Sequence, residues 1–304
     1  MRRVAIKTVY LGWLFHGSQV QPGVPTVEGE ILRALRRTGF AEGRDGCGFR
    51  AAGRTDRGVS ALGNVFSFIV RGDADLFSLA NALNAEMRGV FVRGVAGVGE
   101  GFDPRRASER WYRYFFPIHP RVAEGFDFSA VEKAARLFVG RHDFSCFSKG
   151  DERNPVREVF SVDTGRLCFD GGDVGMESFP RTFLVVDIRG ESFLWQMVRR
   201  ITGALVMVGR GDLDIGDIEA LLQRPSRSSQ RALPPPVPPE GLVLMDVKYG
   251  RRDRGADEVE FLDCDVRISQ KKAWGLWVEG SFRFIPLMVV LAPIFSGDFS
   301  PPPW

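Results

Sequence analysis

The chain has 304 residues, of which 44% are hydrophobic and 26% are charged. This composition supplies enough apolar material for a sizeable core in one large domain or two medium ones. Lysine and arginine (41 residues) nearly balance aspartate and glutamate (38 residues), which gives a net charge of +3. The overall charge therefore does not indicate a polyanionic partner.

The first part of the chain predicts a strand, a helix and a second strand. Residues 4–11 form an apolar run that is typical of a strand. A helix follows Thr26, which can act as its N-cap. The apolar stripe of this helix comprises Val27, Ile31, Ala34 and Leu35. Residues 64–70 alternate between two sets of side chains, which predicts a strand that is buried on one face.

The middle of the chain continues the alternation of strands and helices. Residues 110–114 are predicted to form a strand. Ser129 and Glu132 have the spacing of a capping box, which predicts a helix that begins there and ends at Gly140. Its apolar face comprises Val131, Ala134, Ala135 and Phe138. Residues 182–188 are rich in β-branched side chains and predict a buried strand.

The next predicted helix ends at Gly209. Its apolar stripe comprises Leu194, Val198, Ile201, Leu205 and Val208. Arg199 lies about 100° around the helix from Val198, so its guanidinium could lean along the buried side into a cleft. Most arginines in such positions extend into water instead.

Two further segments complete the predicted order. Residues 234–239 contain five prolines and are expected to be extended and polyproline-like. Residues 241–249 predict an apolar strand that returns to the sheet. The alternation of strands and helices along the chain fits an α/β or α+β architecture.

Cysteine and histidine usage gives no sign of a metal site. The four cysteines include no CxxC pair, which indicates neither a zinc site nor a disulfide framework and is typical of an intracellular protein. The three histidines lack ligand spacing, so we expect no metal. These residues are Cys47, Cys146, Cys168, Cys264, His16, His119 and His142.

The sequence also gives no sign of a membrane anchor. The longest apolar stretch, residues 284–295, is about a dozen residues long and contains Pro286 and Pro293, whereas a membrane-spanning helix needs about 20 residues. The start of the chain lacks the continuous apolar core of a signal peptide. We therefore expect a cytoplasmic location, no membrane association, and a buried or interface-covering role for residues 284–295.

One short motif suggests chemistry. Asp56 lies between Arg54 and Arg57 in a turn that is bracketed by Gly53 and Gly58. Neighbouring arginines favour the ionised form of a carboxylate, and an ionised carboxylate suits nucleophilic attack better than general acid catalysis. An aspartate beside a glycine also commonly accepts hydrogen bonds from backbone amides in a turn. The local chemistry alone leaves both roles open.

The motif GRTDRGV at residues 53–59 resembles the signature of the TruA family of tRNA pseudouridine synthases. Five further segments are similar to motifs of this family and occur in the same order. They lie within residues 10–29, 102–114, 140–157, 193–203 and 238–242. The resemblance covers roughly residues 4–249, and several ordered motifs are far more specific than one.

The resemblance implies an α+β pseudouridine synthase fold, in which two ferredoxin-like α/β subdomains share a largely antiparallel sheet with a central cleft. It also implies an isomerase that converts uridine to pseudouridine in the anticodon arm of tRNA, at tRNA positions 38–40, and that acts as a homodimer. The reaction breaks one bond and forms another without a change of redox state. We therefore expect no cofactor.

The resemblance also implies roles for four residues. Asp56 is expected to be the nucleophile, and Arg199 is expected to keep its carboxylate ionised and oriented. Tyr112 is expected to stack on the uracil. Arg54 is expected to take the space or the phosphate that the target nucleotide vacates when it flips out of the RNA. Whether Asp56 attacks the base or the sugar, or assists elimination at the ribose, stays open.

The family pattern suggests three segments. Residues 1–104 are expected to carry the Asp56 motif, and residues 105–250 the tyrosine and arginine motifs. Residues 251–304 are expected to form an extension of unknown role. Arginines cluster at 105/106, 110/113, 199/200 and 251–254. Such clusters are a non-specific indication of nucleic-acid binding, since a solvated face paired with acids explains any single one as well.

Some positions depart from the family pattern. Ser18 stands where the family usually has a large aromatic residue, Ser60 where bacterial members have histidine, and Trp195–Gln196 where they have a histidine pair. These departures are similar to the archaeal branch. Two alternative functions remain: a non-catalytic protein that binds or folds tRNA on the same scaffold, and a hydrolase of glycosidic bonds in which Asp103 assists Asp56.

Overall fold

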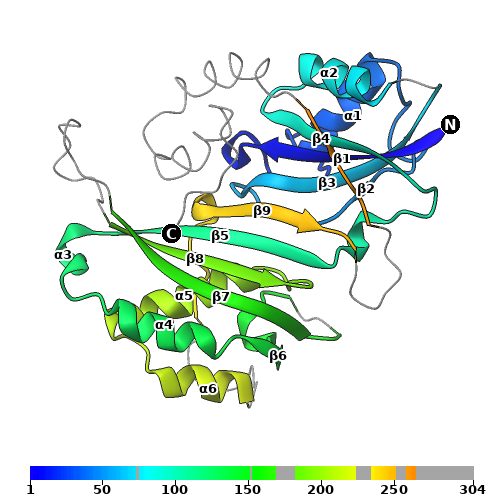
Figure 1. The fold of residues 1–304 in the computed structure, drawn as a ribbon. Helices are drawn as coiled ribbons and strands as arrows, with labels where there is room; N and C mark the ends of the chain where they lie inside the picture. The colour runs from blue at the N-terminus through cyan, green and yellow to red at the C-terminus, as the bar shows by residue number, and fades with distance from the viewer. Residues whose placement is uncertain (73–74, 151–152, 169–181, 224–233, 251–257, 265–304) are drawn as a thin grey trace. The chain divides into compact units, whose positions relative to one another are not determined.

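The computed structural model describes residues 1–72, 75–150, 153–168, 182–223, 234–250 and 258–264. The chain divides into two compact units, one comprising Met1–Ser108 with Val243–Trp304 and the other comprising Glu109–Leu242. Both units combine a sheet with packed helices, so the fold is α+β, as predicted (Figure 1). The arginine cluster at 251–254 and the apolar stretch at 284–295 lie outside the described residues.

The first unit has the strand and helix order of a ferredoxin-like fold. Its elements are β1 (Arg2–Tyr10), α1 (Val27–Arg37), β2 (Arg50–Ala51), β3 (Ser60–Val70), α2 (Leu76–Glu86) and β4 (Val90–Val98). The spatial order of the strands is β4-β1-β3-β2, and each neighbouring pair is antiparallel. Two later strands extend this sheet. They are β9 (Leu242–Lys248), which pairs in parallel with the start of β3, and β10 (Leu262–Asp263), which pairs with β4.

The first helix begins where the sequence predicts it. The side chain of Thr26 accepts a hydrogen bond from Gly29 N at 3.2 Å, which satisfies one of the unpaired amides of the first turn. All four residues of the predicted apolar stripe are buried. The helices α1 and α2 pack side by side against the sheet of their own unit (Figure 1).

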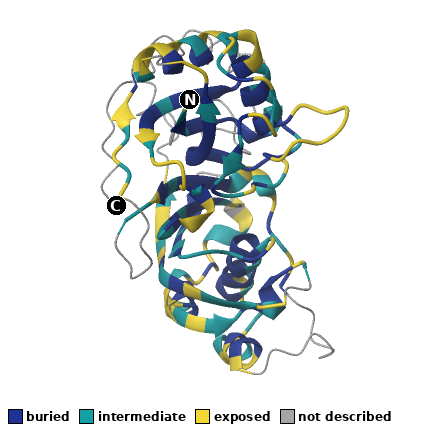
Figure 2. Ribbon diagram, turned by 90° about the vertical axis from the view of Figure 1, so that its right-hand side faces the viewer, coloured by how far each residue is buried: buried dark blue, intermediate teal, exposed yellow. Residues whose placement is uncertain are grey.

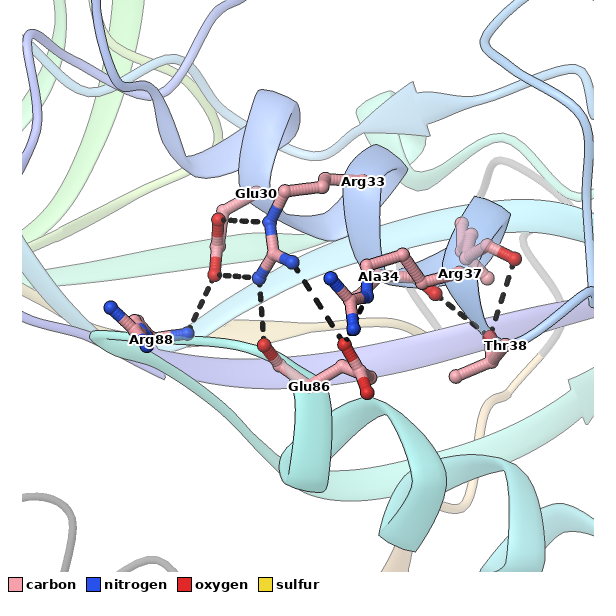
Figure 3. A network of polar contacts seen from close by, with 8 residues as sticks. Glu30, Arg33, Ala34, Arg37, Thr38, Glu86 and Arg88 are labelled. Carbon is pink, nitrogen blue, oxygen red and sulfur yellow. Dashed lines mark hydrogen bonds and ion pairs between the residues drawn. The ribbon is translucent and has the colours of Figure 1, made fainter.

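Charged side chains connect α1 to the end of α2 (Figure 3). Arg33 binds both carboxylate oxygens of Glu30, at 3.0 and 2.7 Å, and also donates to the backbone oxygen of Glu86 at 2.7 Å. The carboxylate of Glu86 pairs with Arg37 at 2.7 Å. The amide of Arg88 donates to Glu30 at 2.6 Å. This network fixes the polar side of α1 to the chain that leads into β4.

The strand β3 differs from its prediction. The sequence predicts burial of one face only, whereas ten of the eleven residues of β3 are buried. The ring of Phe49 explains part of this difference, because its centroid lies 5.7 Å from that of Phe66 and 6.1 Å from that of Phe68. Coverage of both faces thus comes partly from a residue outside β3, 11 positions before its first residue, Ser60.

The second unit repeats the arrangement of the first. Its elements are β5 (Glu109–Ile118), α3 (Pro120–Ala123), α4 (Phe128–Arg136), β6 (Gly140–Asp143), β7 (Val156–Cys168), β8 (Thr182–Gly190), α5 (Met197–Arg210) and α6 (Ile215–Gln223). The strand order is β5-β8-β7-β6, and the neighbouring strands with a described register are antiparallel. The order β5-α4-β7-β8-α5 therefore matches β1-α1-β2-β3-α2. In both units, buried residues line the strands and the inner sides of the helices (dark blue in Figure 2).

The ends of two helices in the second unit correct the sequence prediction. The helix α4 begins at Phe128, one residue before Ser129, because Asp127 accepts a hydrogen bond from Ala130 N at 2.9 Å and acts as the N-cap. It ends at Arg136, before Gly140. The helix α5 starts only after Leu194 and continues past Gly209 to Gly211, which caps it with a φ of 76°. The apolar stripe predicted for α5 is nevertheless buried, Leu194 included.

Residues 234–238 of the proline-rich segment belong to no helix or strand, Pro238 has a φ of −52° and a ψ of 144°, and Pro239–Gly241 form one 3₁₀ turn. This segment packs closely on α5. A Cβ atom on Gly203 would lie 2.1 Å from the backbone oxygen of Pro235, so only glycine permits this approach. Among the helices in the described part of the chain, none has the length and hydropathy that crossing a bilayer requires.

Candidate active site

The Asp56 motif forms the connection between β2 and β3 in the first unit. The amide of Val59 donates to the backbone oxygen of Asp56 at 3.1 Å, and Gly58 has a φ of 88°, which reverses the chain just before β3. The side chain of Asp56 is half-buried, while those of Arg54 and Arg57 are exposed. The turn therefore holds the carboxylate at the surface of the core and directs both flanking cations to solvent.

Ser18 holds this loop at the residue that precedes Asp56. Ser18 N donates to the backbone oxygen of Thr55 at 3.0 Å, and Thr55 N donates to Ser18 Oγ at 2.8 Å. The backbone oxygen of Ser18 in turn accepts from Glu28 N, in the first turn of α1, at 2.9 Å. Gly17 has a φ of 100°, and a Cβ atom there would lie 3.1 Å from the oxygen of Thr55. The departure at Ser18 thus has a structural role.

Polar side chains on β1 and β3 form hydrogen bonds to the same loop. The hydroxyl of Tyr10 lies 2.9 Å from Thr55 Oγ1 and accepts from Asn64 Nδ2 at 3.0 Å. Asn64 Nδ2 also donates to the backbone oxygen of Gly53 at 3.2 Å. The two residues that flank Arg54 are therefore both fixed. Sequence reasoning gave Tyr10, Ser18 and Asn64 no role, although polar residues within apolar strands are a signal that could have found two of them.

Ser60, the second departure from the family pattern, also has a structural role. Its hydroxyl accepts a hydrogen bond from Gly12 N at 2.9 Å, and Ser60 is fully buried. Ser60 opens β3, directly after the Asp56 turn. The bond therefore ties the start of β3 to the chain that leaves β1.

Tyr112 lies on β5 in the second unit, and its side chain is 8% exposed. Its ring meets that of Phe193 edge-on, at a centroid distance of 5.3 Å and an interplanar angle of 89°. Edge-to-face contacts of this kind favour one orientation of each ring. Phe193 belongs to the loop that leads into α5, so this contact links the tyrosine strand to the arginine helix.

Arg199 lies near the start of α5 and is 9% exposed, so its side chain does not extend into water. Its Nε atom donates to the backbone oxygen of Val237 at 2.8 Å, and Val237 N donates to the backbone oxygen of Arg199 at 3.2 Å. The next carbonyl, that of Pro238, accepts from the hydroxyl of Tyr114 at 2.7 Å. The proline-rich segment therefore fixes the direction of the guanidinium.

Tyr114, which lies two residues after Tyr112 on β5, is not suited to act as a base. Burial raises the pKa of Tyr114 far above its ordinary value, and the positive charge of Arg199 offsets this only in part. A phenol with such a pKa keeps its proton at neutral pH. Tyr114 therefore serves as a hydrogen-bond donor to the proline-rich segment.

The four predicted site residues lie two in each unit. Asp56 and Arg54 share one loop, whereas Tyr112 and Arg199 lie on β5 and α5, which pack together. That these four residues act as one site stays a prediction.

Asp103 is poorly suited to the hydrolase alternative. Its carboxylate binds Arg105 through Nε at 3.0 Å and through Nη2 at 2.5 Å. The hydrogen bond from Arg105 holds the pKa of Asp103 below its usual value. A glycosidase needs a carboxylic acid with a raised pKa as its proton donor. Within the described ranges, no group of three histidine, cysteine or acidic residues is placed to hold a metal ion.

Known proteins similar to this chain share one description. A family model described as tRNA pseudouridine synthase matches residues 134–250. The chain is 42% identical over 249 residues to "tRNA pseudouridine synthase A" of Thermococcus kodakarensis, and the alignment covers 81% of this chain and 85% of the relative. It is 37% identical over 274 residues to the protein of the same name from Archaeoglobus fulgidus, which covers 89% and 92%. Both organisms are archaea, in line with the branch predicted from the sequence.

Solved structures give a weaker similarity. A chain from the "Crystal Structure of a Cbf5-Nop10-Gar1 Complex" aligns with 67% of this chain and 45% of its own length, at 11% identity and a TM-score of 0.32. This similarity is too low to support a conclusion.

Proposed function

The chain belongs to the tRNA pseudouridine synthase family. We propose that it isomerises uridines in the anticodon arm of tRNA with Asp56 as the nucleophile. The observation that carries the proposal is the fixation of the Asp56 loop. Ser18, Tyr10 and Asn64 bind the backbone or side chains of residues just before Asp56. A nucleophile held in this way loses little freedom when the substrate binds.

The reaction has three steps that the protein must support. The bond between ribose C1′ and base N1 must break, the detached uracil must turn, and a new bond must join C1′ to C5. C5 then loses its proton and N1 gains one. An ionised carboxylate can form a transient bond to the sugar or to the base, or it can assist elimination at the ribose. Asp56 provides the carboxylate for each of these routes, and atoms and electrons balance without a cofactor.

Tyr112 and Arg199 have complementary roles in this proposal. The ring of Tyr112, oriented by Phe193, stacks on the uracil and holds it while it turns. Stacking is the better role because an ordinary phenol, with a pKa near 10, is a poor base at neutral pH. Nε of Arg199 is bound to Val237. In this proposal its planar guanidinium keeps the carboxylate of Asp56 ionised and oriented.

Arg54 meets the RNA backbone. Its side chain is exposed, and the residues on either side of it, Gly53 and Thr55, are held by hydrogen bonds. Such a side chain can take the place of a nucleotide that has flipped out, or bind the phosphate beside it. Two other expectations from the sequence, a homodimer and a cytoplasmic location, stay predictions.

The test is to incubate the purified full-length chain with an unmodified tRNA transcript and to map pseudouridines by chemical probing. We expect pseudouridine at tRNA positions 38–40. Asp56→Asn and Asp56→Ala should abolish it while tRNA affinity stays within a few-fold, because the carboxylate supplies chemistry and arginines supply phosphate contacts. Binding without any pseudouridine in the wild type would favour the non-catalytic alternative. Loss of binding together with activity would make Asp56 a structural turn residue.

A further inference from the structure

Trp195 is unusually exposed for a tryptophan. Its side chain is 49% exposed, and in the described part of the chain Phe77, at 45%, is the other large aromatic residue with comparable exposure. Large aromatic side chains bury much apolar area when they can, so a half-exposed tryptophan on a folded surface suggests a partner. Trp195 lies in the loop between β8 and α5.

The backbone around Trp195 holds the ring outward. Its neighbour Leu194 is buried, and Met197, which opens α5, is buried too. Met197 N donates to the backbone oxygen of Leu194 at 3.1 Å, which closes a tight turn. Gln196 adopts a φ of 64°, a left-handed conformation that residues other than glycine rarely adopt. The two anchors on either side therefore fix the exposure of Trp195.

Lys149 accompanies the exposed ring. Its amide donates to the backbone oxygen of Trp195 at 3.0 Å, and its Nζ atom lies 4.4 Å from the centroid of the indole. The side chain of Lys149 is exposed as well. Stabilisation of the loop alone would be one explanation for an exposed cation–π contact. Here, however, the backbone bond already joins the two segments, and both charge and ring remain open to solvent.

An aromatic ring beside a cation matches the chemistry of a nucleotide. Bases stack on tryptophan whatever their sequence, and lysine binds the phosphate that follows. The loop also leads directly into the helix that carries Arg199, four residues after Trp195. A nucleotide bound here would thus be held by the segment that positions Arg199.

We propose that Trp195 and Lys149 form an RNA subsite, in which the indole of Trp195 stacks on an unpaired base of the tRNA near the target uridine and Lys149 binds the adjacent phosphate. The proposal rests on the proposed function for its choice of ligand. It assigns a function to the Trp195 position, where the chain departs from the bacterial pattern. In this subsite the stacking supplies affinity that tolerates any base, while Lys149 adds a salt-dependent contact.

The first test measures tRNA affinity in substituted chains. Replacing a stacking aromatic costs about 5- to 150-fold in affinity per base. We expect Trp195→Leu to weaken tRNA binding by about tenfold or more, and Trp195→Phe, which keeps a ring, to stay within about threefold. Lys149→Ala should weaken binding a few-fold and reduce the salt dependence by about one phosphate contact. Equal affinities for the wild type, Trp195→Leu and Trp195→Phe would overturn the proposal.

Matched controls separate stacking from a general loss of surface. Phe77→Leu removes an equally exposed ring from α2 of the first unit, and Lys133→Ala removes an exposed lysine from α4. Both should leave tRNA affinity within about twofold. If Phe77→Leu weakens binding as much as Trp195→Leu does, the effect is not specific to Trp195 and the proposal fails.

Intrinsic fluorescence gives a second readout that does not depend on catalysis. The chain has six tryptophans, so the signal of Trp195 is the difference between the wild type and Trp195→Phe. We expect tRNA to quench this difference signal, in the Asp56→Asn background as well. Quenching without any pseudouridine in the wild type would support the subsite and contradict the proposed function. Pseudouridine formation without quenching would do the reverse.

Discussion

Ser18 and Thr55 exchange two hydrogen bonds, one in each direction, across the loop that carries Asp56. Ser18 N donates to the oxygen of Thr55 at 3.0 Å, and Thr55 N donates to Ser18 Oγ at 2.8 Å. Both residues are buried. Because Asp56 follows Thr55 directly, the position of its carboxylate depends on a serine that lies 37 residues before Thr55 in the chain.

Replacing Ser18 should therefore impair the chemical step more than RNA binding. Ser18→Ala leaves the buried amide of Thr55 without its acceptor, which costs about 1–3 kcal/mol of unfolding free energy. We expect single-turnover rates to fall by about tenfold, while tRNA affinity changes by less than about threefold. Ser129→Ala, at an exposed position of α4, is the control and should change neither quantity. An unchanged rate in Ser18→Ala would show that the loop keeps its position without this bond.

Arg199 and Arg106 should respond differently to lysine. Arg199 is buried with Nε bound to Val237, and its planar fork suits both oxygens of a carboxylate, which a lysine ammonium cannot match. We expect Arg199→Lys to keep the fold and lose turnover by orders of magnitude. Arg106→Lys, at an exposed position, should shift affinity modestly and keep the catalytic step. Single-turnover rates at saturating enzyme separate the two effects. If both variants lose only tRNA affinity, Arg199 is one more arginine that binds the RNA backbone.

Chelation should leave the activity intact. The cysteines and histidines lack the spacing of a ligand set, and the isomerisation consumes no electrons. We expect the same rate with and without EDTA on a prefolded anticodon-arm fragment. The fragment separates a requirement of the enzyme from the effect of metal ions on tRNA folding. Activity that EDTA removes from this fragment, and that one metal restores, would reveal a metal site.

Tyr114 should make the stability of the protein depend on alkaline pH. Burial raises the pKa of Tyr114 above the ordinary value of about 10. Its contribution is thus complete below pH of about 10 and declines as the pH rises toward the pKa of the folded state, since only the unfolded chain releases the proton in that range. We expect the free energy of unfolding to fall more steeply between pH of about 9.5 and 11 in the wild type than in Tyr114→Phe. Parallel pH profiles would contradict this.

The network between α1 and α2 should contribute modestly and in a salt-dependent way. Glu86→Ala removes the 2.7 Å pair with Arg37 and a longer one, at 3.9 Å, with Arg33. Partly exposed pairs of this kind contribute about 0.2–1 kcal/mol each. We expect chemical denaturation to show a loss in this range at low salt and a smaller loss at about 1 M salt. A loss that does not change with salt would indicate packing of the glutamate stem as the cause.

Local signals predicted the elements that local interactions determine. The helix α1 was predicted correctly because its cap, Thr26, and its apolar stripe lie within one short segment. The predicted start of α4 was wrong because Asp127 and Ser129 are both residue types that cap helices well, and the sequence does not rank them. The burial of both faces of β3 was missed because Phe49 covers it from outside the strand.

For the candidate site, the sequence predicted the Asp56 motif but not the residues that support it. The Asp56 motif was found because its residues are contiguous and resemble a family signature. The residues that support it are Tyr10 on β1, Ser18 in the loop before α1 and Asn64 on β3, and they meet only in the folded chain. Trp195 was noted as a departure from the family, but its exposure and its contact with Lys149 depend on the turn at Gln196 and could not be predicted from spacing.

The strand β9 has a consequence for synthesis on the ribosome. It pairs with the start of β3, at Ser60 and Ala61, only a few residues after Asp56, and its Asp246 forms a 2.7 Å ion pair with Lys7 of β1. About 180 residues separate the start of β3 from β9. At about 5–20 residues per second the nascent chain therefore waits roughly 10–35 s after β3 before β9 emerges. During that interval the edge of β3 beside the Asp56 loop lacks its parallel neighbour. The segment proposed to supply the nucleophile is thus among the first to be translated and among the last to be completed.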